Sequence, residues 1–450
     1  MNERNDRLDR LEAAVATAIL GLDTLWGGDV TNPSGTGRFI ADSWFSNEPL
    51  PAAHTHPTAV AVRATGGVTA AAPDLAAIDA YLAVVDLPAA LAAIESGAAA
   101  TAGLRGRYLA NLARSCGVMW DLALEQLGRG AAVPFERAVA ASCGVPPSPS
   151  APGEKIESLR ALLSRAGYHG EPLAAAEAWR ATRGVPKGSI RQLADAFISQ
   201  LDALCVRHLV PHLPARLHGV PRANIEFLPI ADAWFSGSMN YLGRARTADG
   251  TPLYEATYEI NASLEISVPE FVQLVSHEVV PGHVTTFALL QHLYHRGELG
   301  FEATVQTMNT QGATLSEGIA NNAILMAYGV EEIDELPDDD LRIGTLLGLL
   351  QDDAKNQAAW LTYQEGRPQP EVASALRRDF LVSEERAQKL SGPWAKHPLM
   401  GRMYLPCYRA GTEKVAALRR VHRPERFLPA VFGAQGLVDI TTIDEALRTP

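Results

Sequence analysis

Apolar side chains recur at helical spacing along most of this 450-residue chain. Near the amino terminus, Leu8, Leu11, Val15 and Ile19 fall on one face of a helix. The same periodicity predicts further helices over 74–141, 154–166, 171–182, 188–209, 267–296, 312–328, 339–365, 369–389 and 403–421. Asp74, which precedes an apolar run, is expected to be an N-cap. The pattern therefore predicts a mainly α-helical fold.

Two segments interrupt the helical pattern. Over 220–263, Asn224–Leu228 and Tyr254–Ile260 are typical of short strands, with a turn at Asp249-Gly250 between them. Residues 145–153 hold four prolines, which cannot continue a helix. We therefore expect an N-terminal helical region over 1–145 and a second region over 154–450 that contains a small sheet, packed as one two-lobed unit. Residues 28–70, rich in Gly, Pro and Thr, are expected to form an irregular loop.

Composition narrows the classes of function. Hydrophobic residues make up 47% of the chain and charged residues 20%, as in ordinary globular proteins. The net charge of −12 would repel a phosphate backbone, so nucleic acid is not an expected partner. The four cysteines form no CxxC pair, and the apolar run near the amino terminus is too short to span a bilayer. These features predict a cytoplasmic protein that is neither secreted nor membrane-bound.

The chemistry concentrates on the helix predicted from Ser267, where Ser267 and Glu270 have capping-box spacing. This helix reaches His277-Glu278-Val-Val-Pro-Gly-His283. In the zinc motif HExxH the two histidines are four residues apart and share one helical face. Here they are six apart, which in a regular helix turns them about 120° from each other. Because Pro281 and Gly282 can distort the helix, we expect a bulge that returns both imidazoles to one face.

The next apolar helix supplies a third candidate ligand. Glu317 is an acid among apolar residues, and a buried carboxylate requires a cation. Asn321 lies one turn further and is expected to orient a ligand without binding the metal itself. Two histidines, one glutamate and an adjacent Glu278 as general base are typical of a hydrolytic zinc site, although another divalent metal would also fit.

The same residues resemble a known family. The segment from His277 to His283 is similar to the HExxPGH signature of the DUF885 family of bacterial proteins, and Glu317-Gly318 is similar to its EGWA element. The strand ending at Asn261 and the segment Pro406–Gly411 also resemble the family, so that the likeness covers about 220–415. It implies a helical zincin-like fold of the neurolysin or carboxypeptidase kind, with a small sheet beside the active-site cleft. It also implies His277, His283 and Glu317 as zinc ligands, Glu278 as base and Tyr408 as an oxyanion donor.

The chain departs from the family pattern at three places. Ile319 stands where the family usually has Trp, and Ile324 and Leu325 stand where a second acid is usual. The segment 350–356 contains no histidine, whereas the family carries a DTGxH-like element there. Metal binding tolerates such changes better than substrate class does, so the substrate is expected to be specialised.

Other candidate sites have weaker support. His292 and His295 are three residues apart and could share an ion, but they lie near the predicted helix end before Gly297, where positive charge suits the helix dipole. His54 and His56 lie in the loop expected over 28–70. Ser316 misses the GxSxG nucleophile motif by its first glycine. The favoured function is hydrolysis of an amide bond in a peptide or peptide-like small molecule. A metal-dependent tailoring enzyme of small-metabolite biosynthesis and a catalytically inactive binding protein remain as alternatives.

Overall fold

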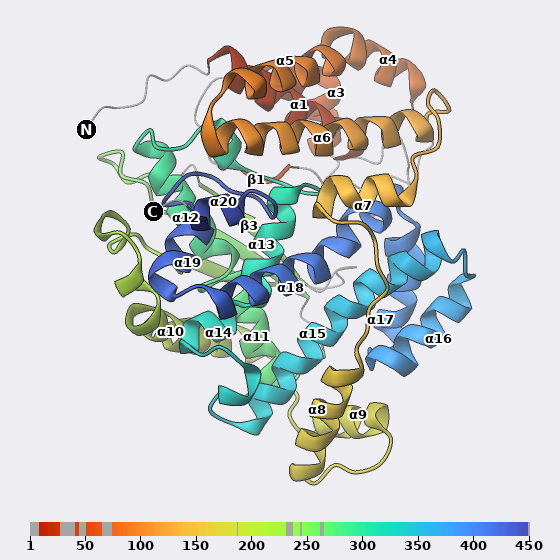
Figure 1. Ribbon diagram of the computed structural model, residues 1–450, viewed down its shortest axis with the longest axis vertical. Helices are drawn as coiled ribbons and strands as arrows, with labels where there is room; N and C mark the ends of the chain where they lie inside the picture. The colour runs from red at the N-terminus through yellow and green to blue at the C-terminus, as the bar shows by residue number, and fades with distance from the viewer. Residues whose placement is uncertain are drawn as a thin grey trace.

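The computed structural model describes residues 9–27, 41–44, 51–64, 74–186, 188–230, 237–243, 245–261 and 265–448. Within these ranges the protein is mostly helical and has a small three-stranded sheet, which confirms the predicted fold class (Figure 1).

Within the same ranges, no single helix has both the length and the apolar composition to cross a membrane. The bent pair α4–α5 (Leu75–Val84 and Leu87–Ala100) meets that test by length and composition alone.

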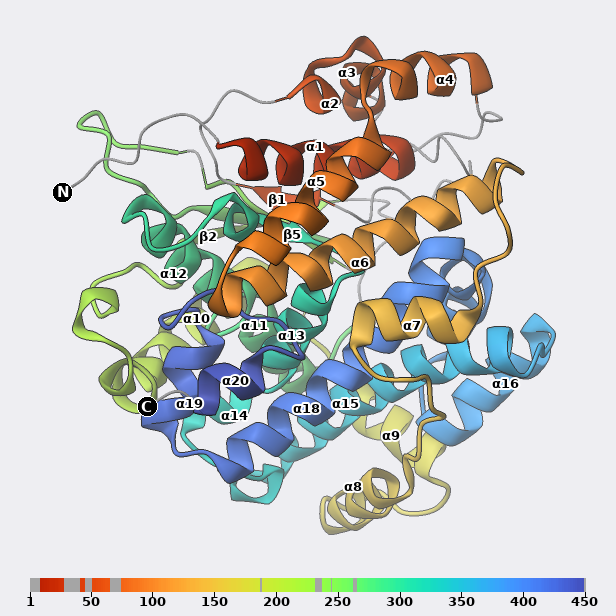
Figure 2. The same ribbon diagram turned by 45° about the horizontal axis from the view of Figure 1, so that its top comes forward.

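The amino-terminal helices form a layer with its own core at the top of the molecule (Figures 1 and 2). The layer consists of α1 (Arg10–Gly27), α4, α5 and α6 (Gly103–Gln126). Asp74 caps α4 by accepting a hydrogen bond from the Ala77 amide, as predicted.

The expectation of an irregular loop over 28–70 is wrong in part. This range contains β1 (Ala41–Trp44), α2 (Ala52–Thr55) and α3 (Pro57–Ala64). Of its other residues, the structure describes only Pro51 and His56.

The layer is joined to the rest of the protein by pairing and by packing. Strand β1 pairs antiparallel with β5 (Val305–Thr307), which comes from the second half of the chain. Helix α7 (Phe135–Cys143) follows α6, and Thr314 Oγ1 donates a 2.7 Å hydrogen bond to the Ser142 carbonyl at its end. The proline-rich residues 145–152 form no helix or strand, in agreement with the prediction that they cannot continue a helix, and they lead to α8 (Gly153–Arg165), α9 (Pro172–Ala181) and α10 (Ile190–His208).

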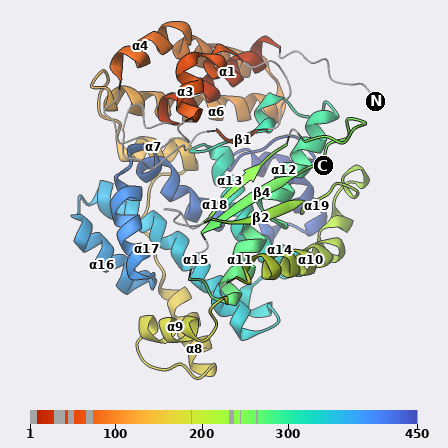
Figure 3. The same cartoon turned by 180° about the vertical axis from the view of Figure 1, so that it is seen from behind.

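A small sheet lies on the face of the molecule opposite to the view of Figure 1 and is seen from behind in Figure 3. Its order is β2 (Ile225–Ile230), β4 (Ala256–Asn261) and β3 (Gly237–Tyr241). The two predicted strands pair in parallel, with Ile225 opposite Ala256, and not as a hairpin. Strand β3, which was not predicted, pairs antiparallel with β4. Side chains of β4 alternate between buried and half-buried, so one face of the sheet packs on the helices beneath.

The remaining helices form the rest of the fold. They are α11 (Val268–Glu278), α12 (His283–His295), α13 (Gln311–Asn321), α14 (Ala323–Tyr328), α15 (Asp339–Ala359), α16 (Gln369–Phe380), α17 (Glu384–Lys389), α18 (Leu405–Val421), α19 (Pro424–Val431) and α20 (Ile443–Arg448). The inner face of the sheet shares a core with several of them, among them α11 and α12. Several predicted helices are interrupted, because residues such as Leu381, with φ of 56°, end one helix before the next begins. Three single π-helical turns, over Trp360–Gln364, Leu390–Trp394 and Met400–Tyr404, were not predicted.

Candidate metal centre

The predicted helix over 267–296 is broken between the two histidines. Helix α11 starts with the expected capping box of Ser267 and Glu270 and ends at Glu278, and α12 starts at His283. At the break the Gly282 amide donates to the Ser276 carbonyl at 3.0 Å, six residues back in place of four. The widened turn absorbs the two extra residues, so the prediction of a distortion at Pro281-Gly282 is confirmed.

Gly282 is required at this break by close packing against the backbone. A Cβ atom there would lie 1.7 Å from the His277 carbonyl oxygen and 2.6 Å from that of Ser276. A side chain would therefore force the turn open and separate the two histidines.

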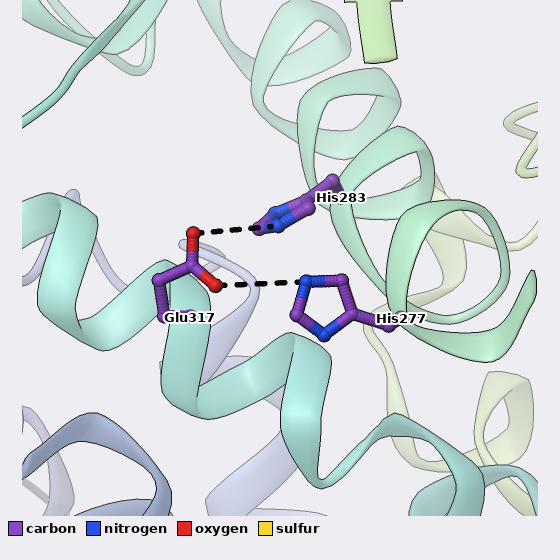
Figure 4. A group of neighbouring side chains, drawn as sticks. All are labelled: His277, His283 and Glu317. Atoms are coloured by element: carbon purple, nitrogen blue, oxygen red, sulfur yellow. Dashed lines mark ion pairs between the residues drawn. The ribbon is translucent and has the colours of Figure 1, made fainter. Parts of the chain in front are cut away.

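The break brings both imidazoles to one carboxylate (Figure 4). His277 Nε2 lies 3.5 Å from Glu317 Oε2, and His283 Nε2 lies 3.8 Å from Glu317 Oε1. The two rings meet edge to face with centroids 4.9 Å apart. One ligand atom from each of the three residues lies within 4.8 Å of the others, which makes this the one such group of three or more residues in the described chain that could hold a metal ion.

The spacing of the donor atoms fits a tetrahedral ion. Ligand bonds of about 2.1 Å at tetrahedral angles place neighbouring donors about 3.4 Å apart. The two nitrogen–oxygen distances, one to each oxygen of the Glu317 carboxylate, are close to this value. Only a neutral imidazole binds a metal. Both histidines meet this requirement, because the pKa of each is lowered. Burial lowers the pKa of His283 to about 4. Burial, and then the charges of His283 and Lys355, hold the pKa of His277 well below its ordinary value.

Each histidine is oriented through its second nitrogen. His277 Nδ1 lies 2.8 Å from Asn321 Oδ1, and His283 Nδ1 lies 3.1 Å from Ser316 Oγ. Asn321 is fixed in turn, because its Nδ2 donates to Thr412 Oγ1 at 2.8 Å. Asn321 thus lies where the sequence places it, whereas Ser316 was considered only as a nucleophile and its place beside His283 was missed.

Two tyrosines of the last long helical segment lie close to Glu317. Tyr404 donates a hydrogen bond to Glu317 Oε1, and its ring centroid is 5.1 Å from that of Tyr408. Sequence reasoning selected Tyr408 and missed Tyr404, although a spacing of four residues puts both on one helical face. Burial, and then the charge of Glu317, raise the pKa of both phenols well above their ordinary value, so both hold their protons.

Two glycines allow the helices that carry these groups to approach closely. A Cβ on Gly318 of α13 would lie 2.3 Å from the Gly411 carbonyl oxygen, and one on Gly411 of α18 would lie 2.0 Å from that of Thr314. Glycine at both positions therefore lets the backbones of α13 and α18 touch. This contact brings the tyrosines of 404–408 to Glu317.

Glu278 follows His277 directly but is not part of the ligand group. It lies beside β4, where its charge and a hydrogen bond add to burial in raising the pKa of Tyr258. Its charge also reaches Tyr408. Sequence reasoning used Tyr258 only as part of a strand, and its contact with Glu278 was not foreseen. The sheet thus adjoins the acid that follows the first histidine.

The other histidine pairs hold different partners. His292 Nδ1 lies 3.0 Å from the Tyr254 hydroxyl, whereas His295 Nε2 lies 3.1 Å from an Arg246 nitrogen. His56 Nδ1 accepts from the Thr58 amide. The segment 350–356, which lacks the family's histidine, lies on α15 and contributes Lys355, whose ammonium group is 3.3 Å from the centre of the Tyr408 ring.

Comparison with known proteins gives a likeness of fold. No family model matches the sequence, and no curated protein matches it. A structure from Colwellia psychrerythraea, of a protein provisionally named a lipoprotein, is similar with a TM-score of 0.50 and 15% identity, over 82% of this chain and 61% of that one. A provisionally named lipoprotein of unknown function from Shewanella oneidensis gives 0.49 and 13%, over 88% of this chain and 77% of that one. This chain therefore spans less than two thirds of the Colwellia protein, and at 15% identity the likeness to that structure shows the fold alone.

Proposed function

We propose that this protein is a zinc-dependent hydrolase of the DUF885 type that cleaves an amide bond in a peptide or peptide-like small molecule. The observation that carries the proposal is the convergence of His277, His283 and Glu317 within ligand distance. Glu278 directly follows the first of them and is left outside the ligand group. Two neutral imidazoles and one carboxylate are a ligand set of known catalytic zinc sites, in which a fourth position stays open.

A zinc ion held by His277, His283 and Glu317 would supply Lewis acidity, which would acidify water and polarise a substrate carbonyl. The remaining roles belong to the side chains. Glu278 takes the proton from the attacking water and passes it to the leaving nitrogen. The Tyr258 hydroxyl orients that carboxylate through the hydrogen bond between them. Tyr408, which stays protonated because burial raises its pKa, donates to the oxyanion that develops on the substrate.

The substitution Glu278→Gln tests the mechanism most sharply. It keeps the size of the side chain and leaves all three ligands in place, but it removes the base. Turnover should fall by about 10²–10⁴-fold, the usual contribution of a positioned acid–base group, while zinc content stays the same. Turnover is measured by mass spectrometry of a peptide-library digest, and zinc is measured on the same samples. Glu157→Gln, at an exposed position of α8, is the matched control and should change neither.

Near-normal turnover by a zinc-loaded Glu278→Gln protein would contradict the hydrolytic mechanism. A metal-dependent tailoring reaction at the same site would then become the better account. A wild-type protein that binds no metal and cleaves nothing would instead favour the inactive binding protein.

A further inference from the structure

A buried cation lies beside the metal centre and has no role in the proposed mechanism. Lys355 of α15 is 8% exposed, and its ammonium nitrogen lies 3.3 Å from the centre of the Tyr408 ring. A cation attracts an aromatic face at distances up to about 6 Å, and most strongly where water is excluded. The ammonium group therefore holds the ring of Tyr408 by a close and buried contact.

The ammonium group is fixed independently of Tyr408. Its nitrogen lies 2.9 Å from Asp352 Oδ1, and the two residues are three apart on α15, so they share one face of the helix. Asp352 is also buried. A buried ion pair typically adds little stability over apolar side chains of similar size. Stability alone therefore does not account for this lysine, whereas a contact that fixes the ring of Tyr408 does.

Contacts between side chains connect Lys355 to the metal centre through Tyr408. The Tyr408 ring meets that of Tyr404 edge to face, with centroids 5.1 Å apart. Tyr404 in turn donates a hydrogen bond to Glu317 Oε1. Lys355 and Tyr404 are buried, whereas Tyr408 is half-buried. Tyr408 is therefore the member of this series that can meet a substrate, and its two neighbours fix its ring.

We propose that Lys355 is a positioning residue, whose contact with the ring of Tyr408 holds the phenol hydroxyl where the oxyanion develops. The inference rests on the proposed function, because it concerns the same site and the oxyanion role of Tyr408. Donors that are fixed before the reaction stabilise the developing charge without first having to reorient. A displacement of about 1 Å in such a group can lower a rate by about 100-fold. Lys355 thus acts on the transition state through Tyr408, without contacting the substrate.

Lys355→Met tests this role, because methionine keeps most of the length of the side chain and removes the charge. With the peptide that the wild type cleaves fastest, we expect kcat to fall by about 10–30-fold, as for a desolvated cation–π contact, while KM stays the same. Zinc content should also stay the same. Lys155→Met is the matched control, since Lys155 pairs at 2.8 Å with Asp353 of α15, and it should change neither constant.

A double-mutant cycle separates positioning from a general loss of structure. In the Tyr408→Phe protein, Lys355→Met should lower kcat no further, because the hydroxyl that the lysine positions is already absent. Two changes that damage the site independently would instead multiply their effects on kcat. Thermal melting verifies that each protein is folded. If Lys355→Met does not fold because Asp352 is left without its cation, the double substitution Asp352→Asn and Lys355→Met takes its place, since it removes both buried charges.

Fluorine NMR detects the contact without turnover. The protein is labelled with 3-fluorotyrosine and measured without metal, and the signal of Tyr408 is identified by its absence from the Tyr408→Phe protein. We expect this signal to shift in Lys355→Met and to stay in place in Lys155→Met.

An unshifted Tyr408 signal in Lys355→Met would overturn the inference, as would independent effects on kcat in the double-mutant cycle. The outcomes separate the two proposals. Normal kcat in Lys355→Met, together with the expected loss in Glu278→Gln, would refute only the role of Lys355. A zinc-loaded wild type that cleaves nothing would refute the hydrolase, and the fluorine signal would still decide whether Lys355 fixes the ring of Tyr408.

Discussion

At the scale of single residues, the site depends on which neighbour holds each ligand. Glu317 accepts a hydrogen bond from Tyr404, and each histidine uses its second nitrogen to contact Asn321 or Ser316. Such contacts fix the direction of a ligand before the metal arrives, and losing one typically costs 10–100-fold in metal affinity or activity.

The two tyrosines should therefore behave differently. Tyr404→Phe removes the donor to Glu317, so we expect zinc affinity to fall by about 10–100-fold. Tyr408→Phe should leave zinc affinity unchanged and lower turnover by about 10²–10³-fold, as for one lost oxyanion donor. Competition with a zinc-binding dye measures the affinity, and peptide digestion measures turnover. Equal effects of both changes on zinc affinity would contradict this division of roles.

The sequence predicted the candidate ligands of the site better than it predicted the residues that contact those ligands. His277, His283, Glu317 and Asn321 could be selected because ligand chemistry and helical spacing are local properties. Tyr258, Ser316, Tyr404 and Lys355 reach the site through contacts between segments that are distant in sequence. Only Tyr404 had a usable signal, its spacing of four residues from Tyr408.

At the scale of elements, the break between α11 and α12 makes the metal centre possible. The rotation of about 120° between residues six apart required a distortion, and the Pro-Gly dipeptide marked its place. Strand β3 and the three π-helical turns gave no such signal, because their formation depends on packing against neighbouring elements.

Gly282→Ala should damage both stability and metal binding. The new methyl group would overlap the His277 carbonyl oxygen, which is backbone and cannot move aside alone. We expect a loss of about 1–3 kcal/mol in the free energy of unfolding, the usual cost of overpacking. Urea denaturation measures it, with Gly153→Ala as control, since a Cβ there meets nothing within 4 Å. An unchanged stability and zinc content in Gly282→Ala would show that the tight turn is not needed.

At the scale of the whole molecule, the amino-terminal layer is joined to the metal region by buried polar contacts as well as by β1–β5 pairing. Arg402, which precedes Tyr404 by two residues, forms two hydrogen bonds of 2.8 and 2.9 Å with Glu125 of α6. The side chain of Arg402 is only 10% exposed, so this ion pair is largely withdrawn from water. The layer therefore supports the segment that carries the tyrosines.

Glu125→Ala should be strongly destabilising, because it leaves a buried guanidinium without its anion. We expect a loss of about 3–5 kcal/mol in the free energy of unfolding. The comparison is Glu157→Ala, which removes an exposed ion pair with Arg160 and should cost no more than about 1 kcal/mol. Equal costs for the two variants in urea denaturation would contradict a supporting role for the Arg402–Glu125 contact.

The metal content of the purified protein tests the central claim most directly. Elemental analysis of the wild type should find one zinc ion per chain, and the variants His277→Ala and Glu317→Ala should each lose it while remaining folded. Full zinc occupancy in both folded variants, or a wild type that binds no divalent metal when one is supplied, would contradict the assignment of His277, His283 and Glu317 as a metal centre.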